Sequence, residues 1–267
     1  MIESLHSPHV ARVKALIGSR GVKERRAAGM FIAEGLQSAR EALISPGGPI
    51  IKSLYVTSAG LLKLVDFDLH EIEVIEVTDA VMSEMTSTVT PQGILALCVL
   101  PRPDISDLAP LAQKQAARVI YLHEIQDPGN AGTILRTADA MGVDAVITSP
   151  GSVDMYSPKV VRATAGSLWH ISLFESVTFS EVIDLIPNAK PLLLSSHATA
   201  SIVDLPLEDS YIALFGNEAR GVDLDSLGVS ASSLTSVTIP MAGRAESLNL
   251  SAAASIVIFT LSRGLAG

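Results

Sequence analysis

The chain has 267 residues, of which 48% are hydrophobic and 18% charged, so it is globular rather than disordered and long enough for two domains. Its formal net charge of −9 at pH 7 excludes a protein whose whole surface is a basic cradle for nucleic acid. The single cysteine, Cys98, excludes an internal disulfide, and its apolar neighbours favour a buried structural thiol in a reducing compartment. Because the N-terminus has no apolar signal core and residues 248–261 are too few to span a bilayer, we expect a soluble cytoplasmic protein.

The first hundred residues alternate short β-runs with helical patterns. The β-runs cover residues 30–33, 52–57, 73–77 and 94–100, and the helical patterns cover 10–18, 22–28, 36–44 and 78–85. This alternation predicts a small α/β domain. Three prolines between positions 101 and 110 then predict a linker, so we place a first domain at 1–103, a linker at 104–114 and a second domain at 115–267.

Basic residues gather in the first two helical patterns, in contrast to the acidic chain as a whole. Between positions 12 and 26 the chain carries Arg12, Lys14, Arg20, Lys23, Arg25 and Arg26. Side chains of this kind bind RNA phosphates. The same run is also typical of the solvated face of an amphipathic helix, and the sequence leaves both interpretations open.

The second domain repeats the alternation with more apolar β-runs. They cover residues 118–122, 145–148, 170–174, 191–195, 211–215 and 236–239. Buried strands separated by helices predict a parallel sheet with helices on both faces. Open sheets of this kind bind ligands at the carboxyl ends of their strands, so the segments that follow the strands are the candidate site.

Three polar segments follow such strands. Residues 123–138 open a helix with Asn130 at or near its N-cap, and they place Arg136 among apolar neighbours, where a guanidinium needs an anion or acceptor. Residues 214–222 present Asn217 and Glu218 after a glycine. Residues 239–250 form a loop with a proline and a glycine that leads into a helix. Each segment alone is compatible with an ordinary cap or turn, including a surface pair between Glu218 and Arg220.

Together, the three segments resemble the SpoU (TrmH-like) family of SPOUT RNA methyltransferases. The family pattern is Asn-x5-Arg, then Gly-Asn-Glu-x2-Gly, then Pro-Met-x-Gly followed by Ser-Leu-Asn. It occurs here as Asn130 and Arg136; Gly216-Asn217-Glu218 with Gly221; and Pro240-Met241-x-Gly243 with Ser247-Leu248-Asn249. Residues 25–26, 31–35 and 90–96 are similar to the small substrate-binding domain that precedes this catalytic domain, which itself resembles ribosomal proteins that bind bent RNA.

The resemblance implies an enzyme that transfers the methyl group of S-adenosylmethionine to a ribose 2′-hydroxyl. The added N-terminal domain favours ribosomal RNA as the substrate. It also implies a deep C-terminal trefoil knot, an exception among folds, and a homodimer. A sulfonium methyl donor needs no metal, and we expect none. The sequence does not identify the RNA or the modified nucleotide, nor whether the modification confers antibiotic resistance.

The resemblance also assigns residues to roles. The cofactor would lie against Ser195, Ser196, His197, Leu214, Phe215, Gly216, Asn217, Gly221, Ile239, Pro240, Met241, Ser247, Leu248 and Asn249. The catalytic set would be Arg136, Asn130, Glu218, Ser247 and Asn249. Arg136 would reach across the dimer interface into the partner's pocket. It would either remove the proton of the hydroxyl or hold a substrate phosphate while the proton leaves to solvent, because free arginine stays protonated above about pH 12.

Three other functions are weighed against this one. A transfer RNA substrate is compatible with the same motifs. A catalytically inactive RNA-binding protein on this fold is disfavoured because the catalytic positions are intact. A nucleotide-cofactor oxidoreductase is disfavoured because neither Gly-x-Gly-x-x-Gly nor Gly-x4-Gly-Lys-Ser/Thr occurs.

Overall fold

The computed structural model describes residues 1–195, 198–245 and 247–263, and the chain divides into two compact units. The N-terminal unit comprises Met1–Pro101 and Asp154–His170. The C-terminal unit comprises Arg102–Val153 and the chain from Ile171 onward. The chain therefore crosses between the units three times, because a short stretch from the middle of the sequence folds with the first hundred residues.

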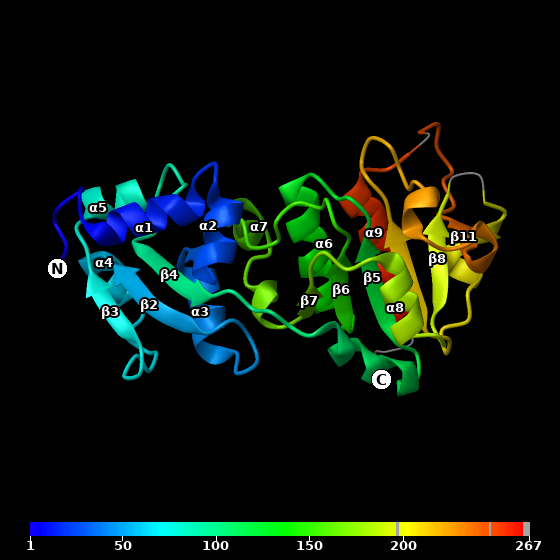
Figure 1. The fold of residues 1–267 in the computed structure, drawn as a ribbon, viewed down its shortest axis with the longest axis horizontal. Helices are drawn as coiled ribbons and strands as arrows, with labels where there is room; N and C mark the ends of the chain where they lie inside the picture. Colours follow the sequence, from blue (N-terminus) through cyan, green and yellow to red (C-terminus); the bar gives the residue numbers. More distant parts are fainter. Residues whose placement is uncertain (196–197, 246, 264–267) are drawn as a thin grey trace. The chain divides into compact units, whose positions relative to one another are not determined.

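The N-terminal unit is built on a mixed four-stranded sheet in the order β1-β4-β2-β3 (Figure 1). Strand β4 runs antiparallel to both β1 and β2, whereas β3 runs parallel to β2. The strands are β1 (Met30–Glu34), β2 (Ile51–Val56), β3 (Glu73–Glu76) and β4 (Ile94–Val99). The helices are α1 (Pro8–Ile17), α2 (Gly21–Ala28), α3 (Leu36–Ile44), α4 (Ser58–Leu62), α5 (Asp79–Met85) and α7 (Pro158–Ala163).

The helices of this unit begin and end at residues with clear local reasons. Ser7 caps α1 by accepting a hydrogen bond from the amide of His9, and Pro8 occupies the first turn, where no amide hydrogen is needed. Gly29 ends α2 in the left-handed conformation with φ +62°. Helices α1 and α5 then pack on the face of the sheet that carries Ile32. Burial of this apolar surface stabilises the unit.

The opposite face of β1 contacts the stretch Asp154–His170. Phe31 packs against Tyr156 and Trp169, with ring centroids 5.1 Å and 6.2 Å away. The indole nitrogen of Trp169 donates to the carbonyl of Pro49 at 3.0 Å. Trp169 is therefore a packing residue, with 3% of its surface exposed. Cys98 is likewise fully buried, as expected, and burial raises the pKa of its thiol.

The C-terminal unit contains a seven-stranded sheet in the order β7-β6-β5-β10-β8-β11-β9, and every pair in it is parallel (Figure 1). This confirms the predicted parallel sheet. The strands are β5 (Arg118–Leu122), β6 (Ala145–Thr148), β7 (Ser172–Phe174), β8 (Lys190–Leu194), β9 (Ala200–Ser201), β10 (Tyr211–Phe215) and β11 (Thr235–Thr238). The helices are α6 (Pro128–Ala140), α8 (Phe179–Leu185) and α9 (Leu250–Ser262). Short 3₁₀ helices cover Ile105–Gln113, Ser167–Trp169 of the N-terminal unit, Ile202–Asp204, Asp225–Leu227 and Ala231–Ser233.

The residues expected as a linker, 104–114, contain a 3₁₀ helix over Ile105–Gln113. Its Leu108 is 1% exposed and lies in the same apolar cluster as Phe179 of α8. Pro110 lies inside this 3₁₀ helix and does not keep the segment from packing. Part of the segment therefore contributes to the core of the C-terminal unit.

The strand order places the candidate site. Strands β5, β6 and β7 follow one another outward, while β10 lies between β5 and β8. The direction of winding thus changes beside β5, and such a switch point is where parallel sheets bind ligands. Helix α9 packs along α6, and the buried guanidinium of Arg118 holds its last turn by donating to the carbonyl of Leu261 at 2.7 Å. None of the described helices combines the length and apolar character needed to cross a bilayer.

Candidate active site

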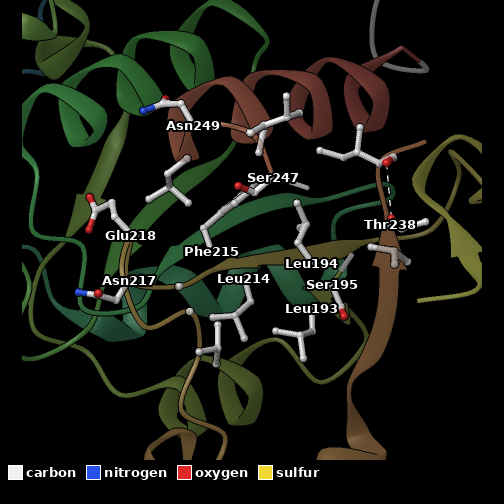
Figure 2. Close-up of a pocket in the computed structure, with 18 of the residues that line it drawn as sticks. Leu193, Leu194, Ser195, Leu214, Phe215, Asn217, Glu218, Thr238, Ser247 and Asn249 are labelled. Carbon is white, nitrogen blue, oxygen red and sulfur yellow. Dashed lines mark hydrogen bonds between the residues drawn. The ribbon is translucent and has the colours of Figure 1, made fainter. Parts of the chain in front are cut away.

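A pocket of about 900 Å³ lies at the carboxyl ends of β8, β10 and β11 (Figure 2). Volumes of this size are typical of small-molecule and cofactor sites. The lining comes from the two later polar segments, the ends of these three strands, Asn130, Leu224 and Ala253. It consists of Asn130, Leu193, Leu194, Ser195, Leu214, Phe215, Gly216, Asn217, Glu218, Arg220, Gly221, Val222, Leu224, Val237, Thr238, Ile239, Met241, Ser247, Leu248, Asn249, Leu250 and Ala253.

One wall of the pocket is apolar and is made by strand ends. Leu193 pairs with Leu214 in the register of β8 and β10, and Leu194 pairs with Val237 in the register of β8 and β11. Beyond these pairs the strands stop, and backbone groups of the following loops border the same space. Apolar side chains at strand ends suit the flat, weakly polar face of a nucleobase.

The loop of residues 216–221 is held in a tight turn. Asn217 and Gly221 exchange backbone hydrogen bonds of 2.8 Å and 2.9 Å, and Gly221 has φ +70°. A Cβ on Gly216 would lie 2.4 Å from the backbone of Gly221, so only glycine permits this approach. The side chain of Asn217 donates to the carbonyl of Glu124 at 2.9 Å and accepts from the amide of Ala219 at 3.0 Å. The turn therefore presents the next residue, Glu218, in a fixed position.

Glu218 collects hydrogen bonds from the start of α6. Its carboxylate accepts from the amides of Gln126 at 3.2 Å and Asp127 at 3.0 Å, and from the side chain of Asn130 at 3.3 Å. Burial by itself raises the pKa of Glu218, but these donors outweigh burial and hold that pKa below its ordinary value. Glu218 is therefore ionised at neutral pH. Asn249, which donates to Asn130 at 3.2 Å, extends the network to α9.

Arg220 does not pair with Glu218, so the surface pair considered from the sequence is wrong. The guanidinium of Arg220 instead donates to the carboxylate of Glu124 at 2.7 Å. Glu124 has φ +51°, an uncommon conformation for a residue with a side chain. The pair therefore leaves the Glu218 carboxylate to Asn130 and the amides.

The third segment, residues 239–250, supplies six residues of the pocket lining: Ile239, Met241, Ser247, Leu248, Asn249 and Leu250. The helix expected after this loop is α9, and Asn249 is its N-cap, where it accepts hydrogen bonds from the amides of Ser251 at 2.9 Å and Ala252 at 3.3 Å. Ser247 and Met241 line the pocket, whereas Pro240 is not among the lining residues. Of the residues expected after β8, Ser195 lines the pocket, and Ser196 and His197 lie outside the described residues.

Arg136 stands apart from the pocket of its own chain. It is exposed on α6 and does not belong to the pocket lining, whereas Asn130 at the start of the same helix does. Helix α6 is joined to α9 by a hydrogen bond of 3.2 Å between the hydroxyls of Thr137 and Ser255.

Among the described residues, no group of three His, Cys, Asp or Glu side chains could hold a metal ion.

Comparison with known proteins assigns both halves of the chain. Residues 117–259 match the SpoU rRNA Methylase family, and residues 8–96 match the MRM3-like substrate binding domain. The chain belongs to the SpoU rRNA methylase family. The turn at Gly216–Gly221 and the N-cap at Asn249 both lie within the range matched by the SpoU rRNA Methylase family.

Similar proteins of this family cover nearly the whole chain. The 23S rRNA (guanosine(2553)-2′-O)-methyltransferase RlmP of Bacillus subtilis is 33% identical over 241 residues, which are 90% of this chain and 91% of that protein. A 23S rRNA (uridine(2479)-2′-O)-methyltransferase of Streptomyces viridochromogenes is 28% identical over 92% of this chain and 86% of that protein. The AdoMet-bound rRNA methyltransferase from Sinorhizobium meliloti superposes with a TM-score of 0.83 at 29% identity, over 100% of this chain and 98% of that one.

The basic run lies in the substrate-binding match and is only partly available to a ligand. Arg12, Lys14, Arg20, Lys23 and Arg26 are exposed on or beside α1 and α2, and Lys14 pairs with Glu84. Arg25 departs from the expectation, because it is 3% exposed. Its guanidinium donates to the carboxylate of Asp154 at 2.8 Å and also bonds the carbonyl of Leu16. Arg25 is therefore not available to an RNA phosphate.

Sequence reasoning missed the apolar half of the pocket. Leu193, Leu194 and Leu224 line it and lie outside the three polar segments, and Val222 lies at the end of the second segment without being assigned a role. Leu193 and Leu194 end a strand that the sequence did predict, so their position at a carboxyl strand end was the available signal. Val222 and Leu224 follow the Gly221 turn and gave no such signal.

Proposed function

We propose that this protein is an S-adenosylmethionine-dependent methyltransferase that methylates a ribose 2′-hydroxyl in ribosomal RNA. The observation that carries the proposal is the pocket at the ends of β8, β10 and β11, where SpoU motifs supply a carboxylate–amide–amide chain from Glu218 through Asn130 to Asn249. Two similar proteins are 2′-O-methyltransferases of 23S rRNA, and a structural relative holds AdoMet.

The residues of the pocket fit this cofactor. S-adenosylmethionine supplies an electrophilic methyl group when bound, and its adenine needs an apolar slot edged by backbone donors and acceptors. Leu193, Leu214 and Ile239 line such a slot beside the open ends of three strands. Gly216 and Gly221 keep the turn narrow enough for the backbone to border the cofactor. The remaining contacts would come from Ser195, Phe215, Asn217, Met241, Ser247, Leu248 and Asn249.

The polar chain positions the reacting ribose. Glu218 is an ionised acceptor, and it orients Asn130 by accepting from its amide nitrogen. Asn249 is oriented in turn by capping α9. Ser247, on the same side of the pocket, adds a hydroxyl that can donate or accept (Figure 2). Fixing the hydroxyl and methyl donor in line accounts for much of the rate in a transfer that needs no covalent intermediate.

Arg136 acts in the pocket of a second copy. The arginine is exposed on α6, and neighbouring α9 carries the exposed apolar side chains Ile256 and Phe259, 40% and 56% exposed. An apolar stripe beside an arginine is suited to an isologous homodimer interface. In that dimer Arg136 holds a substrate phosphate beside the 2′-hydroxyl, because a guanidinium binds phosphate oxygens through paired charge-assisted hydrogen bonds.

Two further features belong to the proposal. The last segment, from β11 to α9, passes through the loop before it and forms a trefoil knot, in keeping with the position of β10 between β5 and β8. Residues 1–103 serve as the RNA substrate-binding domain, 104–114 join the two domains, and 115–267 carry out methyl transfer. The exposed basic residues Arg12, Lys14, Arg20, Lys23 and Arg26 contribute phosphate contacts.

The test is incubation with tritium-labelled S-adenosylmethionine and total RNA lacking the modification, followed by mapping of alkali-resistant dinucleotides. Label in a large-subunit ribosomal RNA dinucleotide supports the proposal. Label in transfer RNA instead would show that the substrate is a transfer RNA. Arg136→Ala is expected to lower the rate at least about a hundredfold while the protein still binds S-adenosylmethionine. Unchanged transfer by that variant would contradict the role of Arg136, and absence of cofactor binding by the native chain would leave an inactive RNA-binding protein.

A further inference from the structure

The loop of residues 86–93, between α5 and β4, carries an apolar side chain that nothing in the unit covers. Val89 is 101% exposed, the highest value among the exposed large hydrophobic residues of the described chain. Exposing a valine completely forgoes the stabilisation that its burial would give. A fully exposed apolar side chain at a loop tip is therefore a candidate contact for a ligand.

The loop is held at both ends, so its tip is presented rather than loose. At one end the carboxylate of Glu34 accepts from the amide of Ser87 at 2.8 Å. At the other end Gln92 accepts from the amide of Leu36 through its side chain and from Lys63 through its carbonyl, both at 2.8 Å. A segment pinned in this way loses little entropy when it binds.

Arg162 of α7 is fixed beside this loop. Its Nη1 donates to the hydroxyl of Ser87 at 3.0 Å and contacts the carboxylate of Glu34 at 3.4 Å. The Glu34 side chain is 4% exposed, whereas that of Arg162 is 41% exposed. The buried carboxylate therefore orients the guanidinium, and its remaining donors stay accessible. Lys159 adds an exposed amine one turn earlier on the same face of α7.

Charge divides across the sheet of the N-terminal unit. Six acidic residues lie between positions 66 and 79, around the edge strand β3. The opposite edge strand is β1, and the helices that contact it include α2, α3 and α7. These helices carry five exposed basic side chains: Lys23, Arg26, Arg40, Lys159 and Arg162. The edge that holds Arg162 is thus the edge that attracts a polyanion.

We propose that Arg162 and the 86–93 loop form a contact site for an unpaired nucleotide of the RNA substrate. Arg162 binds the phosphate, and Val89 packs against the face of the adjacent base or sugar. Unpaired nucleotides offer both a charged backbone and an uncovered base face, which matches an oriented guanidinium next to an exposed apolar tip. This inference rests on the proposed function. It adds a residue from the methyltransferase match, Arg162, to the RNA surface of the N-terminal unit.

The test measures binding of a 23S rRNA transcript by filter retention over a range of salt concentrations. Arg162→Gln is expected to weaken binding about tenfold and to reduce the salt slope by about one, because one phosphate contact is lost. Val89→Ser is expected to weaken binding about fivefold with an unchanged salt slope, because only apolar contact is lost. Arg162→Lys keeps the charge and should retain the salt slope. Matched controls are Lys52→Gln and Val65→Ser, which remove an exposed charge and an exposed valine elsewhere in the unit.

Each variant is first checked by thermal unfolding and by calorimetry with S-adenosylmethionine, so a folding defect is separated from a binding defect. In methylation assays the two site variants should raise the KM for RNA and leave kcat unchanged. Native-like RNA affinity in both variants would overturn this site while the proposed function stands. Weakened RNA binding without methylation by the native chain would keep the site and overturn the function. Loss of binding to ribosomal particles but not to the transcript would indicate a protein partner and overturn the RNA assignment.

Discussion

Asn249 donates a hydrogen bond of 3.2 Å from its side chain to Oδ1 of Asn130, and so joins the N-cap of α9 to the first turn of α6. The direction of this bond is determined. Oδ1 of Asn249 already accepts from the amides of Ser251 and Ala252, so Nδ2 must face Asn130. Asn130 then has its own Nδ2 toward Glu218. The whole chain is therefore polarised, with donors pointing toward one carboxylate.

Asn249→Asp tests that polarity. Aspartate still caps α9 but cannot donate to Asn130, so the midpoint of thermal unfolding should stay within a few degrees while methyl transfer falls at least about tenfold. The control is Thr178→Ala at the N-cap of α8, which removes a capping box outside the pocket lining. It should cost about 1 kcal/mol of stability and leave the specific activity unchanged. Equal activity of Asn249→Asp and the native chain would show that the link to Asn130 is dispensable.

Glu218→Gln should lower stability at pH 7 by roughly 1 kcal/mol, because an amide NH2 would replace one of the two accepting oxygens and face the backbone donor of either Gln126 or Asp127. The folded pKa of Glu218 lies below its ordinary value, so its contribution is present above that ordinary value and is lost as pH falls through the folded pKa. Urea unfolding at pH 7 and pH 3 measures this. The difference in the free energy of unfolding between the native chain and Glu218→Gln should be smaller at pH 3 than at pH 7. An equal difference at both pH values would contradict an ionised Glu218 that accepts these hydrogen bonds.

The elements and the three motifs could be predicted because their signals are local. Apolar runs define β5, β10 and β11, and Asn249 precedes an apolar helix, where a cap is expected. Long-range pairings gave no such signal. Asp154 lies 129 residues from Arg25, and only the fold brings the two together. For the same reason the sequence could not show that Arg25, one residue of the basic run, is buried while the others are exposed.

The strand directions in the mixed sheet of the N-terminal unit are a second feature that the sequence could not predict. Alternating strands and helices suggest parallel neighbours, yet β4 runs antiparallel to β1 and β2. Strand direction depends on which neighbours a strand finds across the sheet, and the hydrophobic pattern of Ile94–Val99 is the same in either direction. The apolar wall of the pocket could not be predicted for a related reason, because the sequence does not distinguish Leu193 and Leu194 from strand residues that line no pocket.

His123 should make stability fall in mildly acidic solution. The hydroxyl of Ser226 donates to the carbonyl of Asp223 at 2.7 Å, so it must accept from Nε2–H of His123 at 3.0 Å. Nδ1 is then unprotonated, buried and without a partner among the described residues. Burial lowers the pKa of His123, against the smaller opposite effects of Glu124 and Asp223.

The sign follows from proton binding. Because the unfolded chain binds a proton near pH 6.5 and the folded chain does so only at lower pH, stability is lost as pH drops below about 6.5. Urea unfolding at pH 7.5 and 5.5 measures the decrease in the free energy of unfolding. His123→Gln keeps a donor for Ser226 and should remove the part of that decrease that comes from His123. An identical pH dependence in the variant would assign the effect to other groups.

Removing Arg25 should destabilise the N-terminal unit strongly. Arg25 and Asp154 have side chains that are 4% and 7% exposed, so Arg25→Met leaves a buried carboxylate without its partner. We expect a loss of about 3–5 kcal/mol in urea unfolding. The double variant Arg25→Met/Asp154→Leu should recover part of that loss, because no unpaired charge remains buried. Arg26→Gln, on the exposed side of the same helix, should change stability by less than about 0.5 kcal/mol. A single variant no less stable than Arg26→Gln would mean that water reaches Asp154 and that the pair does not hold the stretch Asp154–His170 to α2.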